Sequence, residues 1–199
     1  LQALLSGCDP VTGATLGHPL VDRTLSDGKV IRAVAGFDAT VIDAAPLDAR
    51  RYSYRLWLDR ASGMLLGSML REASGAPVEQ LAFTRLRLRM ASAAPAPQAA
   101  RPAPVAPTGP AWEVTDLPAG FALVARPSAL AGSEHLLFSD GMASVSVYVD
   151  PPGKGLVGVS RRGAINAFGL ATADAHVVVV GDLPAATVMQ IAHSVRRAR

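Results

Sequence analysis

A stretch near the middle of the chain, residues 91–111, cannot contribute to a folded core. It holds six of the 15 prolines in the 199-residue sequence, and it has no aromatic residue and no apolar periodicity. Proline removes a backbone donor and favours the extended polyproline conformation, so the stretch forms a semi-rigid spacer of up to roughly 60 Å, at about 3.1 Å per residue. The sequence therefore predicts two modules, residues 1–90 and 112–199, joined by a Pro/Ala-rich linker, residues 91–111.

Alternating apolar and polar residues predict antiparallel strands in the first module. In residues 51–59 (RYSYRLWLD) the tyrosines and leucines at even positions fall on one face of an extended strand. Turn residues follow, and a second apolar run begins at once, which is typical of a β-hairpin. The other expected strands are residues 30–35, 39–43, 64–71 and 78–90. Consecutive strands with one apolar face form an open sheet or a partial barrel, so we expect a partial antiparallel β half-barrel.

The second module is predicted to be a small α+β domain. Residues 143–149 alternate alanine or valine with serine and tyrosine, which is the pattern of a half-buried strand. Residues 121–124, 135–138, 163–168 and 176–180 are the other expected strands. Together they predict a small antiparallel sheet.

A C-terminal helix is expected to cover one face of this second sheet. Asp182 can cap it and Pro184 suits its first turn. Its apolar stripe is formed by Val188, Ile191, Ala192 and Val195. Three arginines, Arg196, Arg197 and Arg199, fall where the helix dipole favours cations. The expected fold class is thus α+β, a half-barrel followed by a small sheet with a C-terminal helix.

The positive charge of the chain is mild and does not indicate nucleic acid as a partner. The net charge is +3 and the sequence pI is about 9.5. Arg85, Arg87 and Arg89 alternate with apolar residues, which places them on the solvent-exposed face of the expected strand 78–90. No basic groove studded with aromatic residues accompanies them. The sequence also has no uninterrupted apolar run of about 18 residues, the length that a membrane-spanning helix requires.

The beginning of the chain leaves two interpretations open. Residues 5–8 (LSGC) match a bacterial lipobox, in which the cysteine is lipidated after cleavage. Only seven residues precede Cys8, too few for the apolar region of a signal peptide, and the alternative is a lone unpaired cysteine. A single cysteine permits no internal disulfide and identifies no compartment. Because the first module resembles the back half of a half-barrel, we also expect that sequence is missing upstream.

No motif in the chain predicts catalysis, a cofactor or a metal. Residues 153–158 (GKGLVG) satisfy the pattern GxGxxG, but prolines precede them and no helix is expected to follow, which predicts a flexible loop. The four histidines lack metal-ligand spacing, and one cysteine cannot complete a zinc site. Ser139 and Asp140, near His135, indicate turn chemistry because no nucleophile elbow is present. We therefore predict a protein that is not an enzyme.

Aromatic residues and methionines of the first module admit two interpretations. They form a plain hydrophobic core, or they line a concavity that accepts lipid, since a half-barrel cannot bury both of its faces and flexible methionines tolerate variable acyl chains. The lipid-facing candidates are Tyr52, Tyr54, Trp57, Met64, Met69 and Phe83.

Seven short motifs lie along both modules: residues 32–36 (RAVAG), 51–59 (RYSYRLWLD), 79–84 (EQLAFT), 117–121 (LPAGF), 139–148 (SDGMASVSVY), 163–166 (GAIN) and 180–187 (VGDLPAAT). In this order and spacing they resemble the MucB/RseB family of periplasmic sigma-E regulatory proteins over residues 30–193. The block RYSYRLWLD with its following SGMLL is similar to the family's RYxYRLWLD segment, SDGMASVSVY to SDGLASVSVF, and VGDLPAAT to VGEVPPAT.

The resemblance implies a lipoprotein-carrier-like N-terminal domain, a small C-terminal domain and a periplasmic location. It implies a negative regulator of the sigma-E envelope-stress response. Such a regulator binds the periplasmic segment of an RseA/MucA-like membrane anti-sigma factor and shields it from proteolysis. Lipid-like ligands such as lipopolysaccharide release it. A homo-oligomer is also expected. The alternative function is a periplasmic carrier of lipids or lipoproteins.

Two further expectations follow from matching the family's pattern. Family members carry many more residues before the first motif, whereas only 31 residues precede Arg32 here, so the half-barrel is expected to be truncated. The partner-binding candidates at matched positions are Asp140, Gly141, Ser144, Ser146 and Tyr148. The alternative role of these residues is simply to form a turn and a strand.

Overall fold

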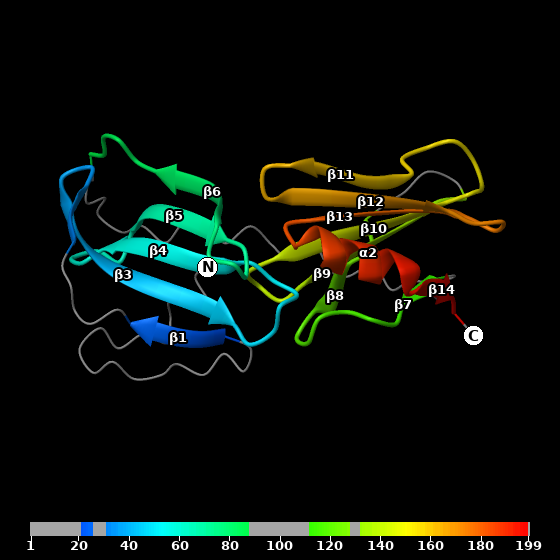
Figure 1. The fold of residues 1–199 in the computed structure, drawn as a ribbon, viewed down its shortest axis with the longest axis horizontal. Helices are drawn as coiled ribbons and strands as arrows, with labels where there is room; N and C mark the ends of the chain where they lie inside the picture. The colour runs from blue at the N-terminus through cyan, green and yellow to red at the C-terminus, as the bar shows by residue number, and fades with distance from the viewer. Residues whose placement is uncertain (1–20, 26–30, 88–111, 128–131, 199) are drawn as a thin grey trace, which may run out of the picture.

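The described residues form two six-stranded antiparallel sheets that meet end to end, and a short two-stranded sheet beside the second of them (Figure 1). The computed structural model describes residues 21–25, 31–87, 112–127 and 132–198. The predicted linker and Cys8 lie outside the described residues. No helix in the described part of the chain is long and apolar enough to cross a membrane.

The first sheet is antiparallel, and from β3 onward each strand pairs with the next strand along the chain. Its strands are β1 (Val21–Leu25), β2 (Ile31–Val34), β3 (Phe37–Pro46), β4 (Ser53–Asp59), β5 (Leu65–Arg71) and β6 (Pro77–Ala82). Their order is β1-β3-β4-β5-β6, with β2 pairing with β3. Since β1 and β6 do not pair with each other, the described sheet is open, as expected for a partial barrel. Its core is formed by Ile42, Leu56 and Leu58.

The last strand of the first sheet is shorter than the predicted strand 78–90. β6 ends at Ala82, which pairs with Gly67 of β5. Phe83 makes one more backbone hydrogen bond, to Leu66 at 3.1 Å, and β5 begins at Leu65, so beyond this point the strand has no neighbour. The prediction that Arg85 and Arg87 lie on a strand is therefore wrong, because residues 83–87 form no strand. Arg89 lies outside the described residues.

The second sheet has the order β11-β12-β13-β10-β9-β8. Its strands are β8 (Ala122–Ala125), β9 (Glu134–Ser139), β10 (Ser144–Asp150), β11 (Gly158–Arg162), β12 (Ile165–Ala171) and β13 (His176–Gly181). The alternation predicted for residues 143–149 is confirmed: Val145, Val147 and Val149 are at most 2% exposed, and the serines and tyrosine between them are not buried. The α+β fold class is also confirmed, since one helix covers this sheet.

That helix, α2 (Ala185–His193), packs its apolar stripe against the buried valines (Figure 1). It ends earlier than predicted, because β14 (Val195–Arg197) follows and pairs with β7 (Trp112–Val114). Arg196 and Arg197 therefore extend a strand instead of a helix. Asp182 is not the N-cap either: Pro184 occupies that position, and the Asp182 carboxylate accepts the backbone N–H of Ser144 at 2.6 Å.

The glycine-rich segment before β11 is packed against the sheet, which the flexible-loop prediction missed. Nε2 of His176 lies 2.8 Å from the Leu156 carbonyl oxygen. A Cβ on Gly155 would come within 2.2 Å of the same imidazole ring, so glycine allows this close approach. As predicted, no helix follows; the strand β11 does.

Candidate functional site

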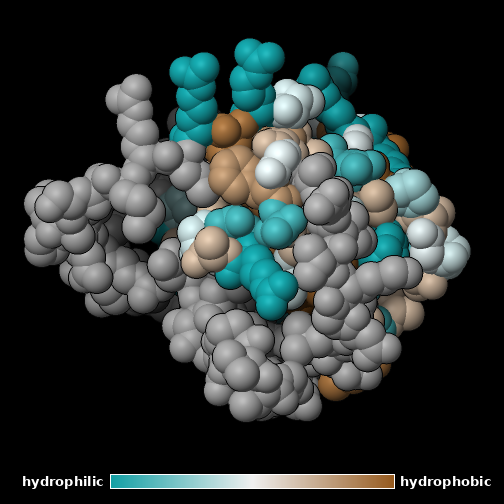
Figure 2. Space-filling view, turned by 90° about the vertical axis from the view of Figure 1, so that its left-hand side faces the viewer, coloured by the Kyte–Doolittle hydropathy of each residue, from teal (hydrophilic) through white to brown (hydrophobic). Residues whose placement is uncertain are grey.

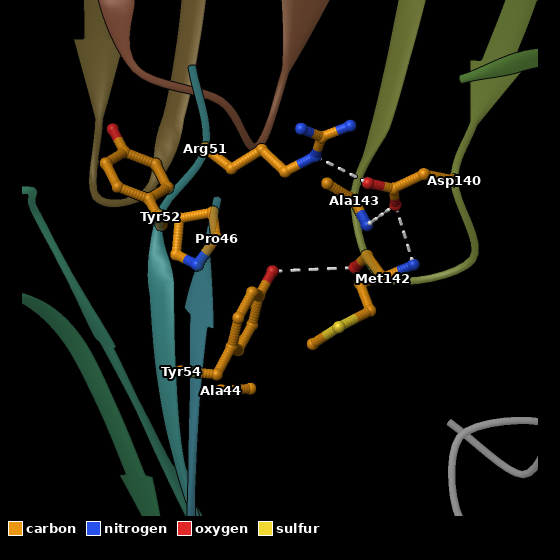
Figure 3. A pocket seen from close by; sticks show the side chains of 8 residues that line it. All are labelled: Ala44, Pro46, Arg51, Tyr52, Tyr54, Asp140, Met142 and Ala143. Atoms are coloured by element: carbon orange, nitrogen blue, oxygen red, sulfur yellow. Dashed lines mark hydrogen bonds and ion pairs between the residues drawn. The ribbon is translucent and has the colours of Figure 1, made fainter. Parts of the chain in front are cut away.

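The two sheets meet at a junction formed by the start of β4 and the turn between β9 and β10 (Figure 3). Arg51 precedes β4, and Asp140 lies in the turn. Nε of Arg51 donates to Oδ2 of Asp140 at 2.8 Å, and both side chains are buried, at 6% and 5% exposure. The guanidinium also donates to the Asp48 carboxylate and the Ala119 carbonyl oxygen. Its central carbon lies 5.2 Å from the centre of the Phe121 ring. Arg51 therefore ties together segments from both modules.

Asp140 is held as a carboxylate by three donors, two backbone N–H groups and one guanidinium. Burial raises the pKa of Asp140, but the backbone N–H groups of Ala143 and Met142 and the Arg51 guanidinium outweigh this effect and keep that pKa below its ordinary value. The two N–H groups lie 2.8 and 2.9 Å from Oδ1. Since the turn itself satisfies one oxygen, the other is free to bind Arg51.

A second buried link joins β4 to β12. Nδ2 of Asn166 donates to the Tyr52 hydroxyl at 2.8 Å and to the Leu183 carbonyl oxygen at 2.7 Å. Tyr52 and Ala164 also share a small apolar cluster with Leu70. The junction is thus closed by these buried side chains, which come from both modules, as well as by the ion pair.

Helix α2 and one exposed ion pair add a third contact to the junction. The Thr187 hydroxyl, in the first turn of the helix, donates to the Arg50 carbonyl oxygen at 3.0 Å. The Arg50 guanidinium lies 2.8 Å from Oδ1 of Asp116, an ion pair exposed enough to contribute about 0–1 kcal/mol. The buried groups, not the surface pairs, therefore fix how the two modules sit together.

Beside the ion pair lies a small cavity. It is lined by Ala44, Pro46, Arg51, Tyr52, Tyr54, Asp140, Met142 and Ala143 (Figure 3). Its volume of about 20 Å³ holds about one water molecule, far less than an acyl chain needs. Burial, together with the charges of Asp182, Asp140 and Glu79, raises the pKa of Tyr54, so its hydroxyl stays protonated. At the cavity the Tyr54 hydroxyl therefore acts as a donor, and it points to the Met142 carbonyl oxygen at 3.5 Å.

The structure divides the lipid-facing candidates instead of gathering them. Tyr52 and Tyr54 share one face of β4 and line the junction. Trp57 lies on the opposite face, as does Met69, which pairs with Arg55. Met64 is half-buried in the β4–β5 turn, and Phe83 is exposed beyond β6.

The surface of the first sheet also bears on the lipid prediction. Viewed from the end away from the second sheet, this sheet exposes hydrophobic surface between hydrophilic side chains (Figure 2). Leu81, on β6, is one exposed hydrophobic residue, at 60%. Contact with a lipid stays a prediction for the candidates named above.

The partner-binding candidates fall into two groups. Asp140 and Gly141 form the junction turn, where the Asp140 carboxylate is already occupied. Ser144, Ser146 and Tyr148 line the face of β10 opposite the buried valines. There Tyr148 stacks on His135, with ring centres 4.2 Å apart, and His135 is hydrogen-bonded to Ser146 at 3.0 Å. Their contact with a partner stays a prediction.

The nearby serine shows the turn chemistry that the sequence indicated. The Ser139 hydroxyl donates to the Ala143 carbonyl oxygen at 2.8 Å and accepts the N–H of Gly141 at 3.0 Å. His135 is bonded to Ser146 instead. Within the described residues, no group of three His, Cys, Asp or Glu side chains could hold a metal ion.

Sequence reasoning missed the residues that build the junction. The alternation pattern places Arg51 only on the strand face opposite Tyr52 and Tyr54, and neither Asn166 nor Thr187 is singled out by it. Each acts through a partner more than 100 positions away or, for Arg51, 89 positions away. The only local signal was that Arg51 opens the most regular strand block of the first module.

Replacing Asp182 with asparagine is expected to change how stability depends on pH. Burial, only partly offset by hydrogen bonds from Ser144, raises the pKa of Asp182. The folded state therefore binds this proton more readily than the unfolded state, and the ionised carboxylate lowers stability above pH about 4. Asp182→Asn should gain stability relative to the wild type as pH rises from 4 to 7, measured by urea unfolding.

Asp140→Asn is the matched control for this measurement, because its pKa shift has the opposite sign. The lowered pKa of Asp140 contributes stability above pH about 4 that is lost as pH falls through the folded-state pKa. Relative to the wild type, this variant should therefore lose stability as pH rises from below the folded-state pKa to about 4, and the difference should change little from pH 4 to 7. Equal pH slopes for both variants would contradict the assignment.

Two sequence-family models match the chain. The MucB/RseB N-terminal domain matches residues 24–104, and the MucB/RseB C-terminal domain matches residues 106–196. The two matches follow each other in the chain, one over the first sheet and one over the second.

A known protein and two solved structures are similar to the chain over most of its length. The sigma factor AlgU regulatory protein MucB of Pseudomonas aeruginosa is 32% identical, over 82% of this chain and 57% of that protein. The structure of the Pseudomonas aeruginosa MucA/MucB complex aligns with a TM-score of 0.70 and 30% identity, over 91% of this chain and 66% of that one. A structure of MucB in complex with MucA(peri) aligns with a TM-score of 0.70 and 31% identity, over 91% and 69%. The chain thus spans little more than half the length of the known protein.

Proposed function

The chain belongs to the MucB/RseB family, and from this premise we propose that it binds the periplasmic segment of an anti-sigma factor and shields it from proteolysis. It acts in the periplasm as a negative regulator of a sigma-E-type stress response. Lipid-like ligands release it from the anti-sigma factor. Its work is binding, without a catalytic step.

The presence of both family domains, in order, carries this proposal. MucB has been crystallised with MucA, and the chain aligns over 91% of its length with MucB in those complexes. The buried junction supports the proposal physically. Arg51 and Asp140 hold two sheets in one arrangement, so a partner that touches both meets a preformed surface instead of ordering it on binding.

Release by a lipid-like ligand follows from linkage. A ligand that binds the partner-free protein more tightly than the complex lowers the partner's affinity by the same factor. Driving an equilibrium from 99% bound to 99% free needs roughly a 10⁴-fold difference in ligand affinity between the two states. The junction cavity is too small for an acyl chain, so the proposed lipid contact belongs elsewhere, on the apolar surface of the first sheet.

A protection assay tests the proposal. The periplasmic segment of the cognate anti-sigma factor is incubated with its site-1 protease, with and without saturating chain. If the bound segment is fully shielded, we expect the cleavage rate to fall in proportion to the fraction of segment bound, which calorimetry measures separately. Binding with unchanged cleavage would contradict shielding, and absence of binding would contradict the function itself.

The release step has its own test. Lipopolysaccharide added to the protected mixture is expected to restore cleavage in proportion to the segment displaced. A mild detergent at the same concentration serves as the control for non-specific unfolding. Displacement by both alike would argue against a lipid signal.

A further inference from the structure

Each sheet ends in strands whose outer backbone groups have no strand neighbour among the described residues. In the two six-stranded sheets these terminal strands are β1, β2 and β6, and β8 and β11; the short two-stranded sheet of β7 and β14 has edges of its own. A row of unpaired N–H and C=O groups is a template on which an extended chain can add as a further strand. The longer edge strands, β1, β6, β8 and β11, differ in how regular a template they offer.

Regular pairing distinguishes β11 from two of the other edges. β11 pairs with β12 over five consecutive positions, from Gly158 with Gly169 to Arg162 with Ile165, and without a register shift. The register of β8 shifts between Leu123 and Ala125, and that of β6 shifts next to its first residue. A shift bends the strand and interrupts its ladder. β1 is regular but carries one acid and one base (VDRTL), so its charge selects no partner.

The β11 edge is basic and carries exposed apolar side chains. From residue 151 to residue 162 every charged residue is basic: Lys154, Arg161 and Arg162. Val157 and Val159 are 71% and 55% exposed. Arg161 makes one exposed ion pair, with Glu72 at 3.2 Å, and Arg162 has no ion-pair partner among the described residues. An added strand would meet exposed valines near the start of β11 and cationic side chains at its end.

The two faces of this edge define the chemistry of the added strand. Val159 and Arg161 point to the face shared with Phe168 and helix α2, because Val159 pairs with Phe168. Ser160 and Arg162 point to the opposite face. Cross-strand neighbours of opposite charge stabilise a sheet and like charges destabilise it, so carboxylates are favoured opposite the arginines. A second copy of β11 would bring its own arginines and is disfavoured.

We propose that the free edge of β11 receives an extended, acidic stretch of the anti-sigma segment as an added antiparallel strand, an inference that rests on the proposed function. Strand addition gives affinity through main-chain hydrogen bonds and specificity through alternate side chains. It also supplies a physical means of shielding. A backbone bonded into the sheet is not available to a protease that must bind the same stretch in extended form.

Hydrogen exchange tests where the segment binds. The 199-residue chain is exchanged with and without the anti-sigma segment used in the protection assay. We expect slower exchange of backbone amides in residues 158–162 on binding and no change in β8. Protection confined to β8, β6 or the junction would overturn the inference and leave the proposed function standing.

Charge reversal tests what the edge recognises. Lys154→Glu combined with Arg162→Glu should weaken binding by about ten-fold, because two favourable charge contacts become repulsive. Neither side chain has an ion-pair partner among the described residues, so the free energy of unfolding, measured with urea, should stay the same. The matched control, Arg60→Glu with Arg85→Glu, makes the same charge change at exposed sites of the first module and should bind within two-fold of the wild type, as expected for surface sites away from the contact.

The outcomes separate the inference from the function on which it rests. Equal loss in both double variants would indicate general electrostatic attraction and overturn docking at β11. Undiminished binding by the Lys154/Arg162 variant would do the same. Failure of the wild-type chain to bind the segment would overturn the proposed function and this inference with it.

Discussion

Replacing Arg51 with alanine is expected to lower the free energy of unfolding by about 3–5 kcal/mol, because it leaves the buried Asp140 carboxylate without its counter-charge. Both side chains are almost fully buried, so water cannot replace the lost partner. The substitution also removes the donors to Asp48 and to the Ala119 carbonyl oxygen. The loss falls on the junction, so the two sheets should no longer unfold together.

The chain provides a fluorescent reporter for each sheet. Its two tryptophans are Trp57, on β4, and Trp112, on β7 beside the second sheet. Trp112→Phe keeps only Trp57, so its fluorescence during urea unfolding reports the first module. Trp57→Phe keeps only Trp112 and reports the second. Coincident transitions are expected when Arg51 is present, and separate transitions when it is alanine.

Arg55→Ala is the matched control for Arg51→Ala. Arg55 also makes two hydrogen bonds to an aspartate, Asp43, at 2.6 and 2.7 Å, but its side chain is 33% exposed and the contact lies within the first sheet. Its removal should lower the free energy of unfolding by no more than about 1 kcal/mol and leave the two transitions coincident. If Arg51→Ala is no more disruptive than Arg55→Ala, the junction does not depend on this ion pair.

Replacing Gly169 with alanine is expected to destabilise the second sheet by about 3 kcal/mol, because the added methyl group meets backbone that cannot move freely. A Cβ at this position would lie 1.8 Å from the Leu156 carbonyl oxygen and 2.4 Å from its carbon. Leu156 is in turn held by His176. To admit the methyl group, the segment before β11 must lift away from the sheet.

Gly153→Ala is the control for Gly169→Ala, since Gly153 lies in the same segment. There the nearest atom to a Cβ would be the Pro151 carbonyl oxygen at 3.7 Å, an ordinary contact, so stability should change by less than about 0.5 kcal/mol. The difference is measured by urea unfolding followed at Trp112. Equal stability of the two variants would show that the segment before β11 moves aside at little cost in free energy.

Local patterns predicted most strands and the helix correctly, because their signals lie within a few residues. The alternation in residues 143–149 fixed which side chains face the core, and the structure buries Val145, Val147 and Val149 as expected. The hairpin after residues 51–59 is present, with β4 and β5 paired antiparallel. In each case a run of neighbouring residues carries the whole signal.

Element ends were predicted less well, because a strand ends where its neighbour ends. The predicted strand 78–90 stops at Ala82 because β5 begins at Leu65 and offers no further pairing. The helix stops at His193 because Val195 pairs with Val114, a residue 81 positions earlier. β11 was missed because the glycines and prolines before it and its two arginines are typical of a loop. Only the pairing with β12 identifies it as a strand.

The sequence alone determined the antiparallel strands, the covering helix and, through its motifs, the family, because periodicity and motif order are properties of neighbouring residues. Tertiary structure alone decided that Arg51 is a buried link between the two modules, and that Asp182 binds Ser144 instead of capping the helix. Ion pairs and hydrogen bonds depend on which groups meet in space. Their partners here lie 89 and 38 positions away.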